Sequence, residues 1–268
     1  MKDPDWKATA FDVGNARVLA ELAFIAYEAD KEKAKKSITY KEEEKGEVKG
    51  KFKMDWVQFF RIDETEALVT YNDTALILAF RGTSSVEDAL TDAKLKLVEG
   101  FKGNGKIHAG FKTGLDKIWN EVWNSMGRKR RGRTIWITGH SLGGALALTA
   151  AARLKFEKNQ RVAGIYTFGQ PRVGDLAFAE ACNKEFGQRY FRFVHNKDVV
   201  TRVPTRNVGF KHTGIFKYIN SALQLDDTMT WDEITKIPYT EQISQILKLG
   251  IKGIQDHSMI NYVEALSK

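Results

Sequence analysis

The chain has 268 residues, of which 43% are hydrophobic and 28% are charged. A chain of this length can bury a sizeable core, and we expect one domain over residues 1–268. The composition excludes collagen-like, low-complexity and globally disordered proteins. No apolar run is long enough for a transmembrane helix.

The excess of 42 basic over 34 acidic residues gives a formal net charge of +8, which attracts anions such as phosphates and anionic lipid headgroups. Basic residues cluster in a mixed run, Lys31 to Lys53, and in Arg128 to Arg133. We interpret both as solvated surface segments. Zinc-finger spacing, an aromatic RNA-binding run and heptads are all absent, so we expect no nucleic-acid partner. The sequence gives no signal for an oligomeric state.

Two features bear on the cellular compartment. The single cysteine, Cys182, excludes an intrachain disulfide, and Met1 to Ala10 lack the apolar core of a secretory signal. Both features favour a cytoplasmic protein, while a secreted mature form whose signal was removed stays open.

The first eighty residues predict a helix and an antiparallel meander. Apolar residues recur at helical spacing from Ala16 to Tyr27, which predicts a helix over residues 12–30. The charged run that follows is expected to be a loop or a hairpin tip. Short strands separated by turn residues are then predicted at Trp56–Ile62, Ala67–Tyr71 and Thr74–Phe80.

Strands alternate with helices after Phe80. The predicted helices are Phe111–Asn124, Leu142–Phe156 and Asp175–Phe186, and the predicted strands are Thr134–Thr138, Val162–Phe168 and Tyr190–Val194. This alternation predicts an α/β fold in which helices cover both faces of a mostly parallel sheet. Residues 224–256 are less regular, and apolar residues from Ile243 to Ile254 predict a helix packed on the core, with a helix near the mouth of a hydrophobic site as the alternative.

Neither a phosphate loop nor a metal site is predicted. Gly100 to Lys106 matches G-x-x-x-x-G-K, but Ile107 stands where the phosphate loop needs Ser or Thr. We interpret this stretch as a glycine-rich surface loop. No two histidines are close enough in the sequence to suggest a metal site.

The strongest chemical signal is Gly139 to Gly143, which reads GHSLG and matches G-x-S-x-G. An apolar strand leads into it and a helical run leaves it, as a nucleophile elbow requires. The serine must sit on a tight turn so that its hydroxyl projects above the sheet, and glycines leave room for the neighbouring backbone. We therefore predict that Ser141 is a nucleophile, with a helix N-cap as the structural alternative.

A serine hydroxyl is a weak nucleophile that needs a base and an orienting carboxylate. Of the three histidines after Ser141, we favour His257, which follows a loop and precedes a short final helix. His195 lies too close to the favoured acid, and His212 precedes a further strand. That acid is Asp198, just beyond a predicted parallel strand, where site residues belong in open α/β sheets.

Asp226, Asp227 and Asp256 remain rival acids on less regular segments. Stabilising an oxyanion needs two N–H donors. One is the backbone N–H of Leu142, and the other is expected from Thr83, in the loop after strand Thr74–Phe80.

Six segments occur in one order along the chain. They are Phe80–Thr83 (FRGT), Ile107–Phe111 (IHAGF), Ile137–Gly144 (ITGHSLGG), Thr167–Gly174 (TFGQPRVG), His195–Pro204 (HNKDVVTRVP) and Asp256-His257. Over roughly residues 10–268 the chain thereby resembles the class 3 lipases, the fungal-type triacylglycerol lipase family of α/β-hydrolases.

The resemblance implies an α/β-hydrolase fold and hydrolysis of lipid esters through an acyl-enzyme on Ser141. It implies Asp198 as acid, His257 as base, and Thr83 and Leu142 as oxyanion donors. No cofactor or metal is expected. A phospholipase A1 or galactolipase, and a catalytically silent binding protein with a hydrolase fold, stay open.

The resemblance also implies that Asp92 steadies the Thr83 hydroxyl and that residues 84–93 form a lid. This segment reads SSVEDALTDA, which is acidic, and Ala89 stands near the place where many members carry tryptophan. We therefore expect weak interfacial activation. The lack of cysteine pairs also departs from the disulfide-bonded secreted members.

Overall fold

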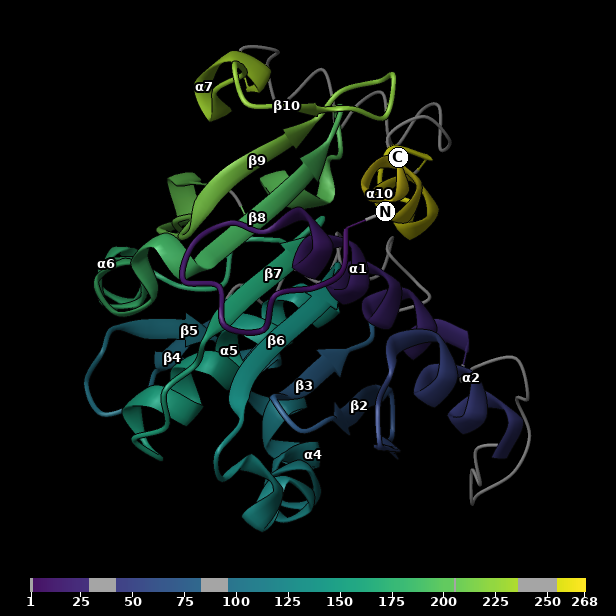
Figure 1. Ribbon diagram of the computed structural model, residues 1–268. Helices are drawn as coiled ribbons and strands as arrows, with labels where there is room; N and C mark the ends of the chain where they lie inside the picture. Colours follow the sequence, from purple (N-terminus) through teal and green to yellow (C-terminus); the bar gives the residue numbers. More distant parts are fainter. Residues whose placement is uncertain (1, 29–41, 83–95, 205, 236–254) are drawn as a thin grey trace.

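The computed structural model describes residues 2–28, 42–82, 96–204, 206–235 and 255–268 (Figure 1). Its centre is an eight-stranded sheet in the order β1-β2-β3-β6-β7-β8-β9-β10. The strands are β1 (Trp56–Ile62), β2 (Thr65–Tyr71), β3 (Ala75–Phe80), β6 (Thr134–His140), β7 (Gly164–Phe168), β8 (Tyr190–His195), β9 (Ile215–Ile219) and β10 (Leu225–Asp226).

The sheet combines the two predicted patterns. Strands β1, β2 and β3 form the antiparallel meander, and β10 adds an antiparallel edge to β9. Between them, β3, β6, β7, β8 and β9 run parallel to one another. Strands β3, β6, β7 and β8 are buried almost throughout, which is typical of parallel strands covered on both faces. The α/β-hydrolase architecture expected from the sequence is therefore present.

Two helical layers cover the sheet. One consists of α4 (Ala109–Met126), α5 (Leu142–Phe156) and α6 (Leu176–Phe186), and the other of α1 (Val13–Glu28), α2 (Glu42–Phe52) and α10 (Met259–Ser267). Side chains along β3 point alternately to the two faces of the sheet. Leu76 and Leu78 therefore pack in the first core, while Ala75 and Ile77 pack in the second. Each layer therefore rests on its own apolar core, and the sheet separates the two cores.

Short elements complete the described chain. A separate hairpin joins β4 (Leu97–Glu99) to β5 (Lys106–His108), and its turn contains the glycine-rich stretch that was expected to be a loop. The remaining elements are α7 (Trp231–Ile234) and the 3-10 turns η1 (Gly127–Arg130), η2 (Gly187–Arg189), η3 (Val200–Arg202) and η4 (Arg206–Val208). None of the helices in the described ranges could span a lipid bilayer.

The expectation of a loop over Lys31 to Lys53 is wrong for its second half, which forms α2. Val48 and Phe52 are buried in the core beside β1, and the Lys51 ammonium lies 2.6 Å from the Glu21 carboxylate. Tertiary packing thus supports a helix whose charged sequence shows little amphipathic pattern. The first half of this run and the helix expected between Ile243 and Ile254 lie outside the described residues.

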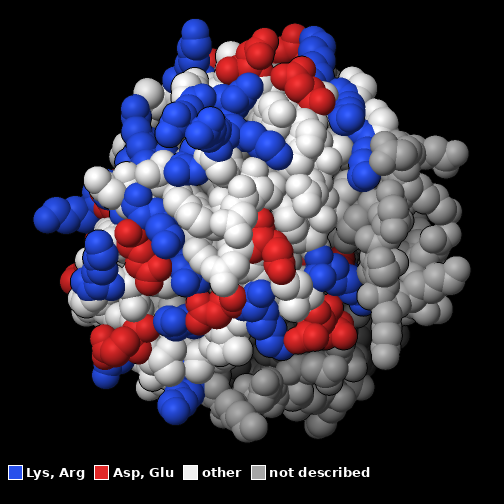
Figure 2. All heavy atoms as spheres, turned by 90° about the horizontal axis from the view of Figure 1, so that it is seen from below, with Lys and Arg blue, Asp and Glu red and all other residues white. Residues whose placement is uncertain are grey.

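The basic run after α4 is packed on aromatic rings. The Lys129 ammonium lies 3.2 Å from the ring centroid of Trp56, and burial lowers the pKa of Lys129. The Arg130 and Arg133 guanidinium groups lie 4.4 Å and 4.6 Å from the rings of Trp123 and Tyr71. Figure 2 shows basic side chains gathered on this lower face of the molecule. The run is therefore only partly the solvated segment that we expected.

The helix after the elbow should depend strongly on its buried side chains. Leu148 in α5 is fully buried, so Leu148→Ala should lower the free energy of unfolding by about 2–5 kcal/mol. The matched change Leu176→Ala removes a side chain that is 53% exposed, and its effect should stay within about 0.5 kcal/mol. Urea denaturation checks both values, and equal losses would contradict this description of the core.

Candidate functional site

The predicted nucleophile lies on a strained turn between β6 and α5. Ser141 has φ 57° and ψ −128°, a conformation that costs a residue with a side chain roughly 1–3 kcal/mol. Its N–H donates to the Phe168 carbonyl at 2.9 Å, which ties the turn to the end of β7. Leu142 is the first residue of α5, where an N–H has no acceptor within the helix.

Two glycines allow this turn because backbone passes directly over them. A Cβ on Gly139 would lie 2.2 Å from the Gly143 carbonyl oxygen, and a Cβ on Gly143 would lie 2.3 Å from the Phe80 carbonyl oxygen. Strand, turn and helix are therefore in backbone contact. The Gly-x-Ser-x-Gly spacing is a steric requirement of this arrangement.

The predicted acid and base lie together in the interior. The His257 Nδ1 is 2.8 Å from Asp198 Oδ2 and 3.0 Å from Oδ1, and both side chains are buried. Asp198 Oδ2 also accepts the Tyr262 hydroxyl at 2.6 Å, and Oδ1 accepts the Val200 N–H at 3.0 Å. These donors stabilise a buried carboxylate, which in turn fixes the orientation of the imidazole.

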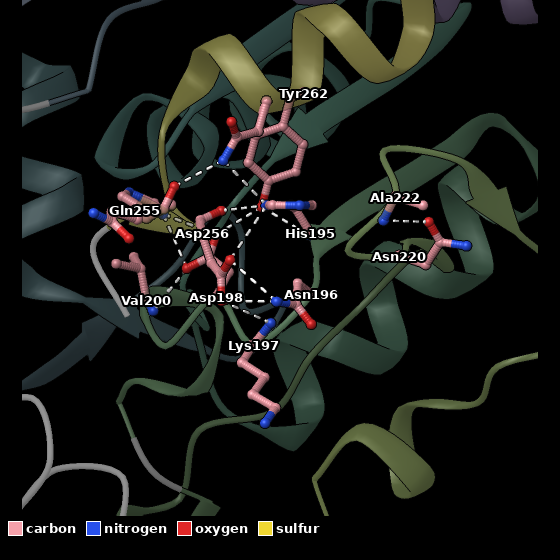
Figure 3. A network of polar contacts seen from close by, with 12 residues as sticks. His195, Asn196, Lys197, Asp198, Val200, Asn220, Ala222, Gln255, Asp256 and Tyr262 are labelled. Carbon is pink, nitrogen blue, oxygen red and sulfur yellow. Dashed lines mark hydrogen bonds and ion pairs between the residues drawn. The ribbon is translucent and has the colours of Figure 1, made fainter. Parts of the chain in front are cut away.

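The segment that carries His257 is held by the end of β8. The imidazole of His195 donates from Nδ1 to the Asp256 carbonyl at 2.9 Å, and the Asn196 amide reaches the Asp256 carboxylate at 3.1 Å. Figure 3 shows this group of polar contacts beneath α10, with Asp198 and Tyr262 close by. Asp256, one of the rival acids, thus anchors the chain beside His257.

The face of the His257 imidazole is closely packed. The His140 ring stacks on it with 4.4 Å between ring centroids, and a Cβ on Gly169 would lie 2.8 Å from His257 Nδ1. The opposite ring nitrogen, Nε2, is buried and has no hydrogen-bond partner among the residues that the structure describes. That atom is free to accept a proton.

Some of the other predicted site residues lie outside the described ranges, and others have partners away from His257. Thr83, Asp92 and the segment 84–93 lie outside the described residues. Gly82, which precedes Thr83, lies against the elbow, since a Cβ there would be 3.0 Å from the Ser141 Cβ. The rival acids Asp226 and Asp227 contact Thr228 and Lys217 instead.

Sequence reasoning missed two tyrosines at this site. Tyr262 of α10 donates to Asp198, and Tyr27 of α1 lies 2.7 Å from His140 Nδ1. Burial and the neighbouring carboxylate raise the pKa of Tyr262 well above its usual value, so its hydroxyl stays a donor. Apolar helical spacing was the only signal for Tyr27, and that signal indicates packing but no polar partner.

Within the described ranges, no cluster of three or more His, Cys, Asp or Glu side chains could hold a metal ion. A hydroxyl on a strained turn, a helix N-terminus and a carboxylate–imidazole pair form the arrangement that acyl transfer uses.

The close approach at Gly169 gives a test of the acid–base pair. Gly169→Ala would place a methyl group within 2.8 Å of both Asp198 and His257, and we expect it to separate their side chains. Gly187→Ala is the matched control, because Gly187 also has a positive φ but nothing lies within 4 Å of its Cβ position. The far-downfield proton NMR signal of an imidazole bonded to a carboxylate should vanish only in Gly169→Ala. Its persistence there would show that the pair tolerates the methyl group.

Comparison with known proteins places the chain in a family. Residues 77–208 match the family model described as lipase (class 3). A lipase of Rhizopus niveus is 30% identical over 201 residues, covering 69% of this chain and 51% of that protein. A secreted mono- and diacylglycerol lipase of Malassezia restricta is 30% identical over 154 residues, covering 53% of this chain and 51% of its own. The chain spans about half the length of these relatives.

A solved structure supports the fold over nearly the whole chain. It is a triacylglycerol lipase whose catalytic centre is described as a serine protease triad, and it superposes with a TM-score of 0.68 at 23% identity. The match covers 93% of this chain and 94% of that one. The chain belongs to the class 3 lipase family.

Proposed function

We propose that this protein is a serine carboxylic-ester hydrolase that cleaves acylglycerols or similar lipid esters. The observations that carry the proposal are the buried Asp198–His257 pair and the serine on a strained strand–helix turn. The elbow and the His257 segment meet at the end of β7. Ser141 bonds to Phe168 there, and the next residue, Gly169, contacts His257.

Acylation follows from these roles. The Ser141 Oγ attacks the ester carbonyl carbon, while its proton passes to His257 Nε2. Asp198 holds the Nδ1–H of the imidazole and stabilises the imidazolium that forms. The imidazolium then gives its proton to the alkoxy oxygen, so that the alcohol leaves and the acyl group stays on Ser141. In deacylation, water loses a proton to His257 and attacks the acyl carbon. The imidazolium then gives that proton to Ser141 Oγ as the acyl–oxygen bond breaks, which releases the fatty acid and restores the serine.

Two N–H groups are proposed to stabilise the oxyanion. The Leu142 N–H lies at the N-terminus of α5, where the helix dipole adds partial positive charge. Thr83 is the proposed second donor, with Asp92 steadying its hydroxyl, and the contact of Gly82 with the elbow supports this position. One such donor contributes about 2.7–4 kcal/mol of transition-state stabilisation.

The substrate class rests on family membership. The Rhizopus, Malassezia and triacylglycerol enzymes are all described as lipases. We propose a lipid ester as the partner of this site, presented at a lipid–water interface. A panel containing triacylglycerol, monoacylglycerol, phospholipid and galactolipid separates a lipase from a phospholipase A1 or galactolipase.

Replacing the proposed nucleophile tests the reaction. Ser141→Ala should lose covalent labelling by a fluorophosphonate probe and lower the hydrolysis of p-nitrophenyl esters by about 10⁴-fold or more. Ser125→Ala, which removes an exposed hydroxyl bonded to Gln58, should behave like the parent protein. Parental activity in Ser141→Ala would refute the proposal, and failure of the parent to label would favour a silent binding protein.

The composition of residues 84–93 predicts how the rate responds to an interface. Because the proposed lid is acidic and Ala89 stands near the place where many family members carry a tryptophan, we expect the rate to rise smoothly as substrate passes its solubility limit. Initial rates on tributyrin across that limit measure this response. A sharp increase at the limit would contradict the expectation.

A further inference from the structure

His140, which precedes the proposed nucleophile, connects three parts of the site. It is the last residue of β6 and is buried, with 4% of its surface exposed. Its Nδ1 lies 2.7 Å from the Tyr27 hydroxyl on α1, and its Nε2 lies 2.8 Å from the backbone carbonyl oxygen of His257. One imidazole therefore joins the first helix, the elbow and the chain that carries the proposed base.

The partners of His140 fix where its protons lie. A carbonyl oxygen only accepts hydrogen bonds, so His140 Nε2 must carry a hydrogen and donate it to His257. Burial, and secondly the neighbouring His257, lower the pKa of His140 well below its usual value, so the ring is neutral. Nδ1 is then an acceptor, and the Tyr27 hydroxyl must donate to it. Burial raises the pKa of Tyr27, which keeps that hydroxyl protonated.

Tyr27 is itself held in place. The Arg81 guanidinium lies 5.5 Å from the centroid of the Tyr27 ring. A Cβ on Gly82 would lie 2.0 Å from the Tyr27 hydroxyl oxygen, so the hydroxyl packs directly against the backbone just after β3. The donor that selects the His140 tautomer is therefore fixed by packing on two sides.

Together with the rest of the site, His140 restricts His257 from several directions. Asp198 holds Nδ1, Gly169 lies close to the imidazole, and the His140 ring stacks on it with an interplanar angle of 30°. The bond from His140 to the His257 carbonyl adds a hold on the backbone from which the imidazole projects. The neutral state of His140 also avoids repulsion when His257 becomes an imidazolium.

We propose that Tyr27 and His140 form a positioning dyad that sets the place of His257 relative to Ser141; this inference rests on the hydrolase function proposed above. Neither residue touches the substrate carbonyl or exchanges a proton with it. The dyad acts by holding the backbone and ring of the base where Nε2 can accept the serine proton. A misplacement of about 1 Å at such a site can lower the rate roughly 100-fold.

A set of four variants tests the dyad. Tyr27→Phe removes the hydroxyl that selects the tautomer and should lower kcat about tenfold with KM unchanged, while His140→Leu removes both bonds and should lower kcat about 100-fold. His140→Gln can still donate to the His257 carbonyl, so it should recover activity to near the level of Tyr27→Phe. The double variant Tyr27→Phe/His140→Leu should be no slower than His140→Leu, because the hydroxyl acts only through the imidazole.

Tyr166→Phe is the matched control. Its hydroxyl is also buried, but it accepts the N–H of Asp12, just before α1, and has no role in the proposed dyad. We expect this variant to keep the parental kcat even if its melting temperature falls. The far-downfield signal of the His257 Nδ1–H should weaken or shift in the Tyr27 and His140 variants and stay unchanged in Tyr166→Phe.

The outcomes distinguish a positioning role of the dyad from a purely structural role. They also distinguish failure of the dyad from failure of the proposed hydrolase function. Variants that lose only melting temperature, while kcat and the downfield signal stay parental, overturn the dyad. Additive losses in the double variant also overturn it, since the two side chains would then act independently. If the parent protein hydrolyses no ester, or Ser141→Ala is as active as the parent, the hydrolase function itself fails.

Discussion

The candidate site depends on the close backbone contact where β6 turns into α5. Gly139 and Gly143 lie so close to neighbouring backbone that a methyl group on either would come within 2.4 Å of it. This contact leaves Ser141 in a strained conformation with positive φ and places the first N–H groups of α5 beside its side chain. The surrounding parallel strands hold this turn in its strained conformation. The energetic cost of the strain is small compared with the stabilisation gained by burying the two apolar cores.

Everything else at the site is arranged around that turn by segments distant in the sequence. β8 ends in a turn that supplies Asp198, and the same turn anchors Asp256 and so the chain that carries His257. α10 adds the Tyr262 hydroxyl to Asp198. The neighbouring helix α1 brings Tyr27 to His140. The two N- and C-terminal helices, which pack together on the sheet, thus both contribute a tyrosine hydroxyl to the polar interior.

Local hydrophobic patterns predicted the strands and helices in which apolar residues face a core along the whole element. The strand before the elbow and the helix after it were expected at Thr134–Thr138 and Leu142–Phe156, and they occur at Thr134–His140 and Leu142–Phe156. The helix α2 was missed because only a few apolar side chains interrupt its Lys- and Glu-rich sequence, and those become informative only once β1 is present to pack against.

The residues of the site also differ in how far the sequence alone predicts them. Chain order and strand ends were sufficient to select Asp198 and His257 as a pair to examine, and the two are in contact. The choice between Asp198 and Asp256 could not be made by spacing alone, since both lie near His257 and only the turn after β8 decides which carboxylate faces Nδ1. Tyr27 was visible only as part of an apolar helix face, because the partner of a tyrosine hydroxyl is a property of tertiary structure.

The most direct test is a crystal structure of the protein after reaction with a long-chain alkyl phosphonate ester, which mimics the tetrahedral intermediate. The account predicts a covalent bond from phosphorus to Ser141 Oγ, a phosphonyl oxygen facing the Leu142 N–H, and His257 Nε2 within about 2.6–3.2 Å of Ser141 Oγ or the leaving-group oxygen. An adduct on another residue, or an imidazole that stays out of reach of the bound phosphonate, would contradict it.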